Sequence, residues 1–242
     1  MSDAAPTHEL PAAAQRRLAE LVAQWALPVA ATAQFSALLL LLARDPHAPT
    51  TVRNPSSGVE AHVADSLTGL LVPELSSAGS IADVGAGAGF PGLALAIARP
   101  QAHVALVESS SRKCEFLERA AEVSEVGNAT VVPARVEDWR PDVAYDAVTA
   151  RAVAPLAVLV EYAAPLLREG GVLVAWKGRR DADEEGAGAR AAAIVGLEPG
   201  PPLAMPPAPG ADHRHLHPFR KVAPTPGRFP RRAGIARKRP LA

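Results

Sequence analysis

Cysteine and aromatic residues are scarce in this chain. Its 242 residues include one cysteine, Cys114, and 4% aromatic residues. A single cysteine excludes an internal disulfide and a cysteine-rich metal site, so a reducing compartment is the simplest location. Residues 1–10 contain Asp3 and Glu9, where a secretory leader would have a basic start and an apolar run. We therefore expect a cytoplasmic protein.

Long apolar runs are missing as well. Residues 26–43 carry no charge, and a segment of this length approaches the minimum for crossing a bilayer. Pro28, Gln34 and other polar residues interrupt it, however, and only Leu38–Leu42 is densely apolar. The pattern predicts a packed helix over Ala30–Arg44, and we expect no membrane association.

Net charge is absent overall, but the charges are unevenly distributed. The chain has 25 basic and 25 acidic residues, yet residues 213–242 contain nine Lys or Arg and no Asp or Glu. These nine are Arg214, Arg220, Lys221, Arg228, Arg231, Arg232, Arg237, Lys238 and Arg239. Clustered cations are typical of surfaces that contact nucleic-acid phosphates, because each neutralised phosphate releases counterions. A solubilising tail is the alternative interpretation.

Apolar runs alternate with helical patterns from residue 80 onward, which indicates a doubly wound α/β fold with a mostly parallel sheet. With 48% hydrophobic residues, the chain suits one such domain plus an appendage. We expect a helical N-terminal extension, residues 1–75, packed on a main domain, residues 76–242. The predicted strands are Ser80–Gly85, Ala102–Glu108, Ala129–Val132, Tyr145–Thr149 and Gly171–Trp176. The predicted helices are Gly92–Ala98, Ser110–Ser124, Pro155–Leu167 and Asp181–Val195.

A glycine-rich turn follows the first predicted strand. Residues 81–92 read Ile-Ala-Asp-Val-Gly-Ala-Gly-Ala-Gly-Phe-Pro-Gly, with glycines at 85, 87 and 89. Such a turn brings bare backbone and the N–H groups of a helix start against a ligand. About twenty residues later Glu108 ends the second strand, where a carboxylate can accept both hydroxyls of a ribose. The stretch therefore predicts a nucleotide-cofactor site.

The identity of the cofactor depends on Asp83. Gly87, Gly89 and Gly92 also satisfy the dinucleotide spacing G-x-G-x-x-G, and a purely structural strand-turn-helix remains a third interpretation. A dinucleotide strand is usually apolar up to its first glycine, whereas the segment from Asp83 to Gly89 resembles motif I of the S-adenosylmethionine-dependent methyltransferases. This resemblance favours S-adenosylmethionine as the cofactor.

A proline- and glycine-rich segment, residues 196–210, predicts a loop that leads into a final hairpin. His213, His215 and His217 alternate there, and on a strand they would share one face, as ligands of a metal site do. Cysteines that often complete such a site are absent nearby, and we expect no metal.

Several separate stretches, in this order and spacing, resemble the glucose-inhibited division protein B family of bacterial 16S ribosomal RNA guanine-N7 methyltransferases. They are His62–Ser66, Asp83–Gly92, Val107–Ser109 with Arg112, Lys113, Phe116 and Leu117, Arg135–Asp138, Ala150–Ala152, Trp176–Gly178, and Phe229–Ile235 with Lys238–Leu241. The match extends from about residue 50 to the end. Before it, the chain lacks the aromatic-rich helix and the Asn-Leu-Thr turn that the family often shows.

The resemblance implies a Rossmann-like class I methyltransferase fold and a set of site residues. Contacts to S-adenosylmethionine would fall at Asp83, Gly85, Gly87, Gly89, Phe90, Glu108, Val136, Glu137 and Arg151. Arg151 and Lys177 would flank the methyl-transfer cleft as catalytic residues. A salt bridge to a surface acid is the alternative interpretation for Arg151, and an exposed loop lysine is the alternative for Lys177. His62, Asp65 and Ser66 have either a packing role or a contact with RNA.

The implied reaction moves a methyl group to N7 of one guanine in the decoding-region loop of 16S rRNA. N7 already has a free lone pair, so no general base is needed, and alignment of the reactants supplies most of the acceleration. A cytosine-C5 mechanism would need a thiol at the cleft, but Cys114 lies on the helix after the second strand. The Asn/Asp-Pro-Pro-aromatic motif of exocyclic-amine methylases is absent after the fourth strand, where Thr149–Val153 stands.

The expected partner is therefore 16S rRNA or the small ribosomal subunit, bound by a monomeric enzyme without a metal. Two other classes stay open on the sequence. A non-catalytic RNA-binding protein with a methyltransferase fold would explain the basic ending and the few catalytic candidates. A dinucleotide-dependent oxidoreductase would bind NAD instead, although Asp83 and the basic ending disfavour it.

Overall fold

One eight-stranded sheet organises the protein, and the computed structural model describes residues 9–206 and 213–241. Its strands are β1 (Ser80–Val84), β2 (His103–Glu108), β3 (Ala129–Pro133), β4 (Tyr145–Arg151), β5 (Leu167–Lys177), β6 (Leu197–Pro199), β7 (Leu203–Ala204) and β8 (His215–Lys221). They lie in the order β3-β2-β1-β4-β5-β8-β6, and β7 also pairs with β8. The first five run parallel to one another, while β8 is antiparallel to β5. The predicted doubly wound, mostly parallel sheet is confirmed.

Two strands are longer than the sequence predicts. β4 continues to Arg151, which pairs with Trp176, and β5 continues to Lys177, which pairs with His215 on β8. Pairing with one neighbouring strand keeps each of these residues extended, although their own polarity is typical of a loop. Arg151 and Lys177 are therefore the last residues of adjacent strands, at the same edge of the sheet.

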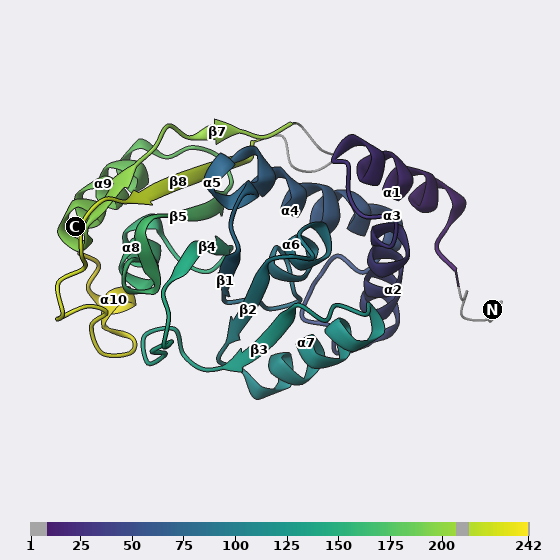
Figure 1. Ribbon diagram of the computed structural model, residues 1–242, viewed down its shortest axis with the longest axis horizontal. Coiled ribbons are helices and arrows are strands. Elements are labelled where there is room, and N and C mark those ends of the chain that lie inside the picture. The colour runs from purple at the N-terminus through teal and green to yellow at the C-terminus, as the bar shows by residue number, and fades with distance from the viewer. Residues whose placement is uncertain (1–8, 207–212, 242) are drawn as a thin grey trace.

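Helices cover both faces of the sheet (Figure 1). They are α1 (Ala12–Gln24), α2 (Ala31–Arg44), α3 (Pro55–Gly58), α4 (Asp65–Leu67), α5 (Pro73–Ser76), α6 (Gly92–Ala98), α7 (Ser111–Val123), α8 (Leu156–Ala163), α9 (Ala182–Val195) and α10 (Ile235–Lys238). A π-helical turn, Val59–Ala64, joins α3 to α4, and 3-10 turns follow α4 and α8 at Thr68–Leu71 and Ala164–Leu166. The predicted helix over 155–167 is shorter because Pro165 lies in the second 3-10 turn and removes an amide donor.

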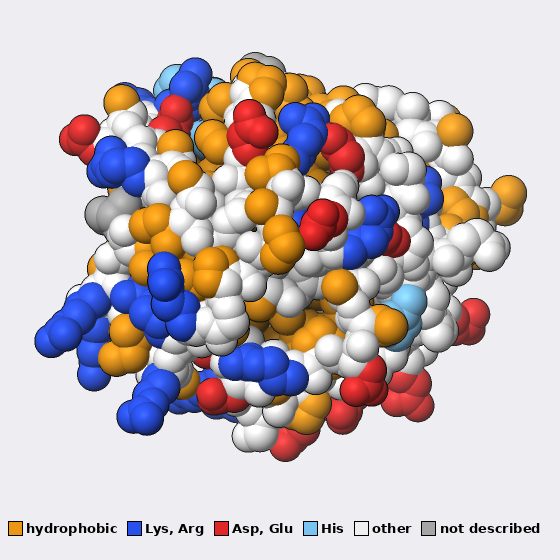
Figure 2. All heavy atoms as spheres, turned by 60° about the vertical axis from the view of Figure 1, so that its left-hand side comes forward, with side chains coloured by type: hydrophobic (Ala, Val, Ile, Leu, Met, Phe, Trp, Pro, Cys, Tyr) orange, Lys and Arg blue, Asp and Glu red, His pale blue; other side chains and the backbone are white. Residues whose placement is uncertain are grey.

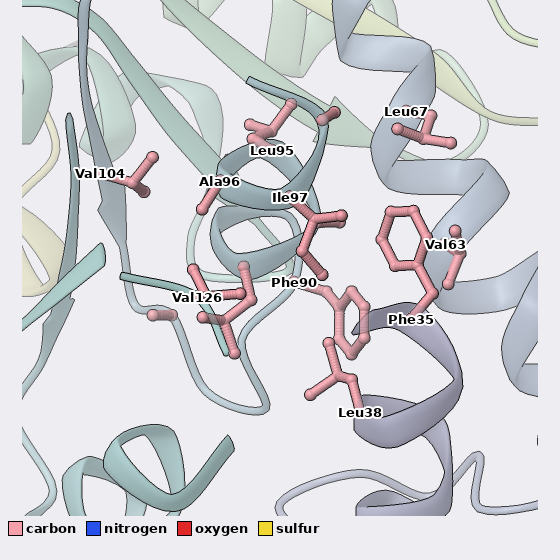
Figure 3. Packing of buried hydrophobic residues seen from close by; sticks show 14 of the residues in the cluster. Phe35, Leu38, Val63, Leu67, Phe90, Leu95, Ala96, Ile97, Val104 and Val126 are labelled. Carbon is pink, nitrogen blue, oxygen red and sulfur yellow. The ribbon is translucent and has the colours of Figure 1, made fainter. Parts of the chain in front are cut away.

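The two faces have separate hydrophobic cores. One buries side chains of α1, α2, α4, α6 and α7 against the sheet, and the other buries α8, α9 and α10. In the first core, Phe90 lies beside Phe35 and Leu38 of α2 (Figure 3). The N-terminal helices thus share a core with the residue that ends the glycine-rich loop.

Most of the uncharged segment 26–43 lies in α2, which begins at Ala31 and buries Phe35, Leu38, Leu39 and Leu42. Within residues 9–206 and 213–241, no helix is long and apolar enough to cross a membrane. Residues 1–8, on which the expected lack of a leader depends, lie outside the described residues.

The segment predicted as a loop, residues 196–210, contains two short strands, β6 and β7, in its described part, so this prediction is wrong there. Antiparallel pairing with β8 keeps both strands extended, and the hairpin of β7 and β8, paired through Leu203 and Leu216, begins earlier than the sequence predicts. His213 precedes β8, so only His215 and His217 lie on the strand, and the expected face of three imidazoles is wrong. In the part of the chain that the structure describes, no group of three or more His, Cys, Asp or Glu side chains is arranged to hold a metal.

Candidate active site

The glycine-rich loop leaves β1 at the carboxyl edge of the sheet and is tied to β2. The amides of Gly85 and Ala86 both donate to the carbonyl of Val107, at 2.8 and 3.2 Å. Gly85 has φ +71°, and a Cβ atom there would lie 2.7 Å from the Val153 side chain. Any other residue would be strained and would collide with the loop after β4. Gly87 and Gly89 follow in the same left-handed region.

Asp83 is buried beneath this loop. Its carboxylate accepts hydrogen bonds from the amide of Gly92 at 3.0 Å and from the hydroxyl of Thr149 at 2.7 Å. A Cβ at Gly92 would lie 2.7 Å from the same carboxylate, so the close approach needs glycine. Burial raises the pKa of Asp83 to about 6, against the opposing effect of these two hydrogen bonds. The carboxylate therefore fixes the start of α6 relative to β4.

The raised pKa of Asp83 predicts a pH-dependent stability. The folded protein holds this proton more tightly than the unfolded chain, so stability falls as pH rises from about 4 to about 6, by roughly 3 kcal/mol. Asp83→Asn has no charge to desolvate, and its amide can serve both neighbours. We expect urea denaturation to show that the free energy of unfolding of Asp83→Asn, relative to that of the wild type, increases by roughly 3 kcal/mol as the pH rises from about 4 to about 6. If this difference in free energy of unfolding is the same at low and at high pH, the assigned pKa of Asp83 is wrong.

Glu108 lies at the end of β2, opposite the loop. One carboxylate oxygen accepts from the amides of Ser109 and Ser110 at 2.8 and 2.9 Å, and the other accepts from Gly87 at 3.2 Å. Lys113 lies 3.8 Å from that second oxygen. The side chain is 7% exposed and borders a cavity of about 250 Å³. Its carboxylate is thus held in place at the cavity wall, where a diol would meet it.

Val136 and Glu137 form the opposite wall of this cavity, which we call the loop cavity. One oxygen of Glu137 accepts from the Tyr162 hydroxyl at 3.0 Å and from the Gly234 amide at 2.9 Å. Burial acts to raise the pKa of Glu137, but these hydrogen bonds outweigh it, and the pKa lies below the usual value. Both of these hydrogen bonds end on the same oxygen, Oε1.

The C-terminal segment closes this side of the loop cavity. Glu161 of α8 is fully buried and forms a bidentate ion pair with Arg231, whose amide also donates to it. Beyond Arg231, Gly234 and Arg237 line the loop cavity, and Arg237 donates to the carbonyl of Val153 at 3.2 Å. The cavity therefore depends on residues some 150 positions away from the glycine loop.

Phe90 is placed differently from the glycines before it. Its side chain is buried against α2 (Figure 3). It also stacks on His62, with ring centroids 4.7 Å apart. His62 in turn contacts the carbonyl of Val52 at 3.0 Å. The side chain of Phe90 thus packs against the N-terminal helices, so only its backbone faces the loop.

Arg151, at the end of β4, does not pair with a surface acid. Its guanidinium donates to the buried carboxylate of Asp65 at 2.6 Å and to the carbonyl of Ala61 at 3.0 Å. It lies 5.7 Å from the Phe90 ring centroid and borders a second cavity, of about 430 Å³. We call this the arginine cavity, and its wall also includes His62, Trp176 and Arg214.

Lys177 borders the same cavity at the end of β5. It is not an exposed loop lysine, because its side chain is 22% exposed and forms an ion pair with Glu184 of α9 at 2.6 Å. The structure thus brings Arg151 and Lys177 to one cavity, but each is held by a carboxylate from another element.

The C-terminal cations are only partly available to a partner. Arg214, Arg220 and Arg231 pair with Asp65, Glu74 and Glu161. Lys221 is buried, and burial lowers its pKa to about 8. The exposed remainder comprises Arg228, Arg232, Arg237, Lys238 and Arg239. Basic side chains gather toward one edge of the face that carries α8, α9 and α10 (Figure 2). The expectation of nine phosphate contacts was therefore too broad, because several of these cations stabilise the fold.

Sequence reasoning missed Tyr162 and Glu161 as parts of the site, and it placed Arg214 only within the basic C-terminal cluster. Glu161 and Tyr162 lie within an apolar helix, so a lone acid beside a tyrosine was the available signal. A charged residue inside an otherwise apolar segment indicates a buried partner elsewhere. The identity of that partner, Arg231, depends on the tertiary fold.

Comparisons of the sequence with known proteins find one family. A family model described as rRNA small subunit methyltransferase G matches residues 31–200. The curated protein of that name from Chloroflexus aggregans is 42% identical over 238 residues, which cover 94% of this chain and 98% of the relative. The one from Rubrobacter xylanophilus is 44% identical over 196 residues, covering 78% and 75%.

Solved structures with a similar fold are more distant in sequence. The S-adenosylmethionine-dependent methyltransferase SibL aligns with TM-score 0.56 and 13% identity, over 75% of this chain and 61% of SibL. The 1,6-didemethyltoxoflavin-N1-methyltransferase of Burkholderia thailandensis, solved with S-adenosylhomocysteine, aligns with TM-score 0.51 and 16% identity, over 69% and 82%. These likenesses show the fold, and the predicted Rossmann-like class I methyltransferase fold is confirmed.

Proposed function

Because this chain belongs to the rRNA small subunit methyltransferase G family, we propose that it transfers a methyl group from S-adenosylmethionine to 16S rRNA. The acceptor is N7 of one guanine in the decoding-region loop. The observation that supports this most directly is that consecutive residues at the end of β4 border two different cavities. Arg151 and Ala152 border the arginine cavity, and Val153 borders the loop cavity.

The loop cavity has the donors and acceptors that S-adenosylmethionine requires. The carboxylate of Glu108 suits the ribose hydroxyls, and the second oxygen of Glu137 suits the exocyclic amine of adenine. The glycine loop presents bare backbone at the other end. When bound, S-adenosylmethionine supplies an electrophilic methyl group on a sulfonium.

The residues around the arginine cavity have a positioning role. Guanine N7 has a free lone pair, so no residue needs to remove a proton before attack. Arg151 donates a hydrogen bond to guanine O6 or to a flanking phosphate, which fixes the base in the arginine cavity. Lys177 adds a positive charge at the far side of the same cavity. Alignment of the base then supplies most of the acceleration.

The reaction is tested with small ribosomal subunits that lack this modification. Labelled methyl groups from S-adenosylmethionine should appear as 7-methylguanosine at one position, identified by mass spectrometry of RNA fragments. Tight S-adenosylmethionine binding with no incorporation into subunits, precursor particles or naked rRNA would favour the non-catalytic RNA-binding alternative. Binding of NAD in place of S-adenosylmethionine would favour the oxidoreductase alternative.

Arg151 gives a second test of the arginine cavity. We expect Arg151→Ala to depress methyl transfer about tenfold to a hundredfold, because a charge-assisted hydrogen bond contributes roughly 1.5–3 kcal/mol. The measurement is turnover at saturating S-adenosylmethionine and saturating subunits, with circular dichroism as the control for folding. Unchanged turnover would remove Arg151 from the acceptor site.

Three further expectations complete the proposal. Residues 1–75 act as a helical extension of a catalytic domain, residues 76–242, and form one wall of the arginine cavity through Thr50–Val52. The enzyme works as a monomer. It acts in the cytoplasm, where its rRNA substrate is assembled into subunits.

A further inference from the structure

Arg214 approaches the arginine cavity from the C-terminal hairpin, on the side opposite the glycine loop. It borders the cavity together with Arg151, although 62 positions separate the two residues in the chain. Both guanidinium groups pair with the carboxylate of Asp65. Arg151 binds one oxygen of that carboxylate at 2.6 Å, and Arg214 binds the other. A single buried acid thus brings two cations to one cavity wall.

Asp65 is held firmly enough to set the position of both arginines. Its side chain is 3% exposed. Its carbonyl accepts from the indole of Trp176 at 3.0 Å and from the hydroxyl of Thr68 at 2.6 Å. Arg214 is anchored as well, because its carbonyl accepts from the amide of Met205 at 3.0 Å. The backbone of Asp65 is thus fixed to β5 by Trp176, and its carboxylate is paired with the hairpin through Arg214.

Each arginine keeps unused donors. A guanidinium has five N–H groups. Arg151 uses Nη1 for Asp65 and Ala61, and Arg214 uses Nη1 for Asp65. Among the described residues, the hydrogen bonds and ion pairs of these two side chains all involve Nη1. The side chains are 20% and 29% exposed, so the remaining donors are reachable from the cavity.

The local charge indicates what binds there. Two guanidinium groups and one carboxylate leave a net positive charge, which favours an anion over the neutral edge of a base. Paired arginines match the oxygen geometry of a phosphate. We propose that Asp65 is a positioning residue that holds Arg151 and Arg214 as a joint clamp for one RNA phosphate beside the target guanine. This assignment rests on the proposed rRNA methyltransferase function.

The first test measures binding of unmodified small ribosomal subunits at several monovalent salt concentrations and fixed magnesium. Arg214→Ala should raise the dissociation constant about tenfold and reduce the slope of log affinity against log salt by about 0.7, the value for one phosphate of single-stranded RNA. Arg214→Lys should restore the slope, because the charge is kept. S-adenosylmethionine affinity should stay within about twofold of the wild type.

Arg168→Ala is the matched control. Arg168 also pairs with an aspartate, Asp146, at 2.6 Å, but it lies at the amino end of β5, away from the cavity. The Arg168→Ala variant should bind subunits with the same slope of log affinity against log salt as the wild type. If Arg214→Ala matches this control in both slope and affinity, the clamp is wrong. A weaker affinity with an unchanged slope would also overturn it, since a contact with a base edge has no salt dependence of this kind.

Asp65→Asn separates positioning from folding. The variant removes a negative charge from the site, so we expect subunit binding at low salt to be as tight as in the wild type or tighter. Turnover should nevertheless fall about tenfold or more, because the arginines lose their shared anchor. A parallel loss of melting temperature, binding and turnover would indicate a purely structural Asp65 and contradict its assigned role. If the wild type itself transfers no methyl group, the proposed function fails, whereas the salt slopes still test the clamp.

Discussion

Replacing Arg231 by methionine is expected to lower the free energy of unfolding by about 3–5 kcal/mol, because removal of one partner leaves a buried charge without compensation. Glu161 has no exposed surface, and both of its oxygens bind the Arg231 guanidinium, the shortest contact being 2.6 Å. The same change releases the segment that contains Gly234 and Arg237, which line the loop cavity. Affinity for S-adenosylmethionine should therefore fall together with stability.

Chemical denaturation measures the first effect, and calorimetric titration measures the second. Arg232→Met is the matched control, since Arg232 is an exposed neighbour in the same segment and its loss should change stability by less than about 0.5 kcal/mol. The double variant Glu161→Leu with Arg231→Met should recover most of the lost stability, because a buried ion pair is often no better than apolar packing. If Arg231→Met is as stable as Arg232→Met, the ion pair does not hold the C-terminal segment.

Replacing Glu108 by alanine should weaken S-adenosylmethionine binding by about a hundredfold or more. Two hydrogen bonds from ribose hydroxyls to a carboxylate would each contribute roughly 1.5–3 kcal/mol. The substitution also removes the acceptor for three amides, those of Gly87, Ser109 and Ser110. The glycine loop would then lose its tie to the end of β2, which adds to the loss of affinity.

Calorimetric titration with S-adenosylmethionine checks this result. Glu108→Gln keeps one acceptor oxygen and should lie between the wild type and Glu108→Ala. Glu115→Ala, an exposed acid on α7, should bind as the wild type does. Wild-type affinity in Glu108→Ala would place the ribose elsewhere.

Local sequence patterns were sufficient for much of the fold. The glycine loop, β1, β2 and α6 were predicted at or within one residue of their bounds, because glycine spacing and apolar runs report directly on backbone conformation. The ends of β4 and β5 were not, since their length depends on pairing with neighbouring strands. For the same reason His213 fell outside the strand that holds His215 and His217.

The candidate site also has one part that the sequence predicts and one part that only the tertiary structure shows. The sequence by itself determined the loop, Asp83, Glu108 and the family, because each depends on residues close together in the chain or on ordered motifs. Only the tertiary structure decided which charges meet: Asp65 with Arg151 and Arg214, Glu161 with Arg231, and Lys177 with Glu184. Most of these pairs join distant segments, and a buried charge is stable only beside its partner. The sequence therefore indicates which charged residues need an oppositely charged partner, and only the packing of the elements decides which residue that partner is.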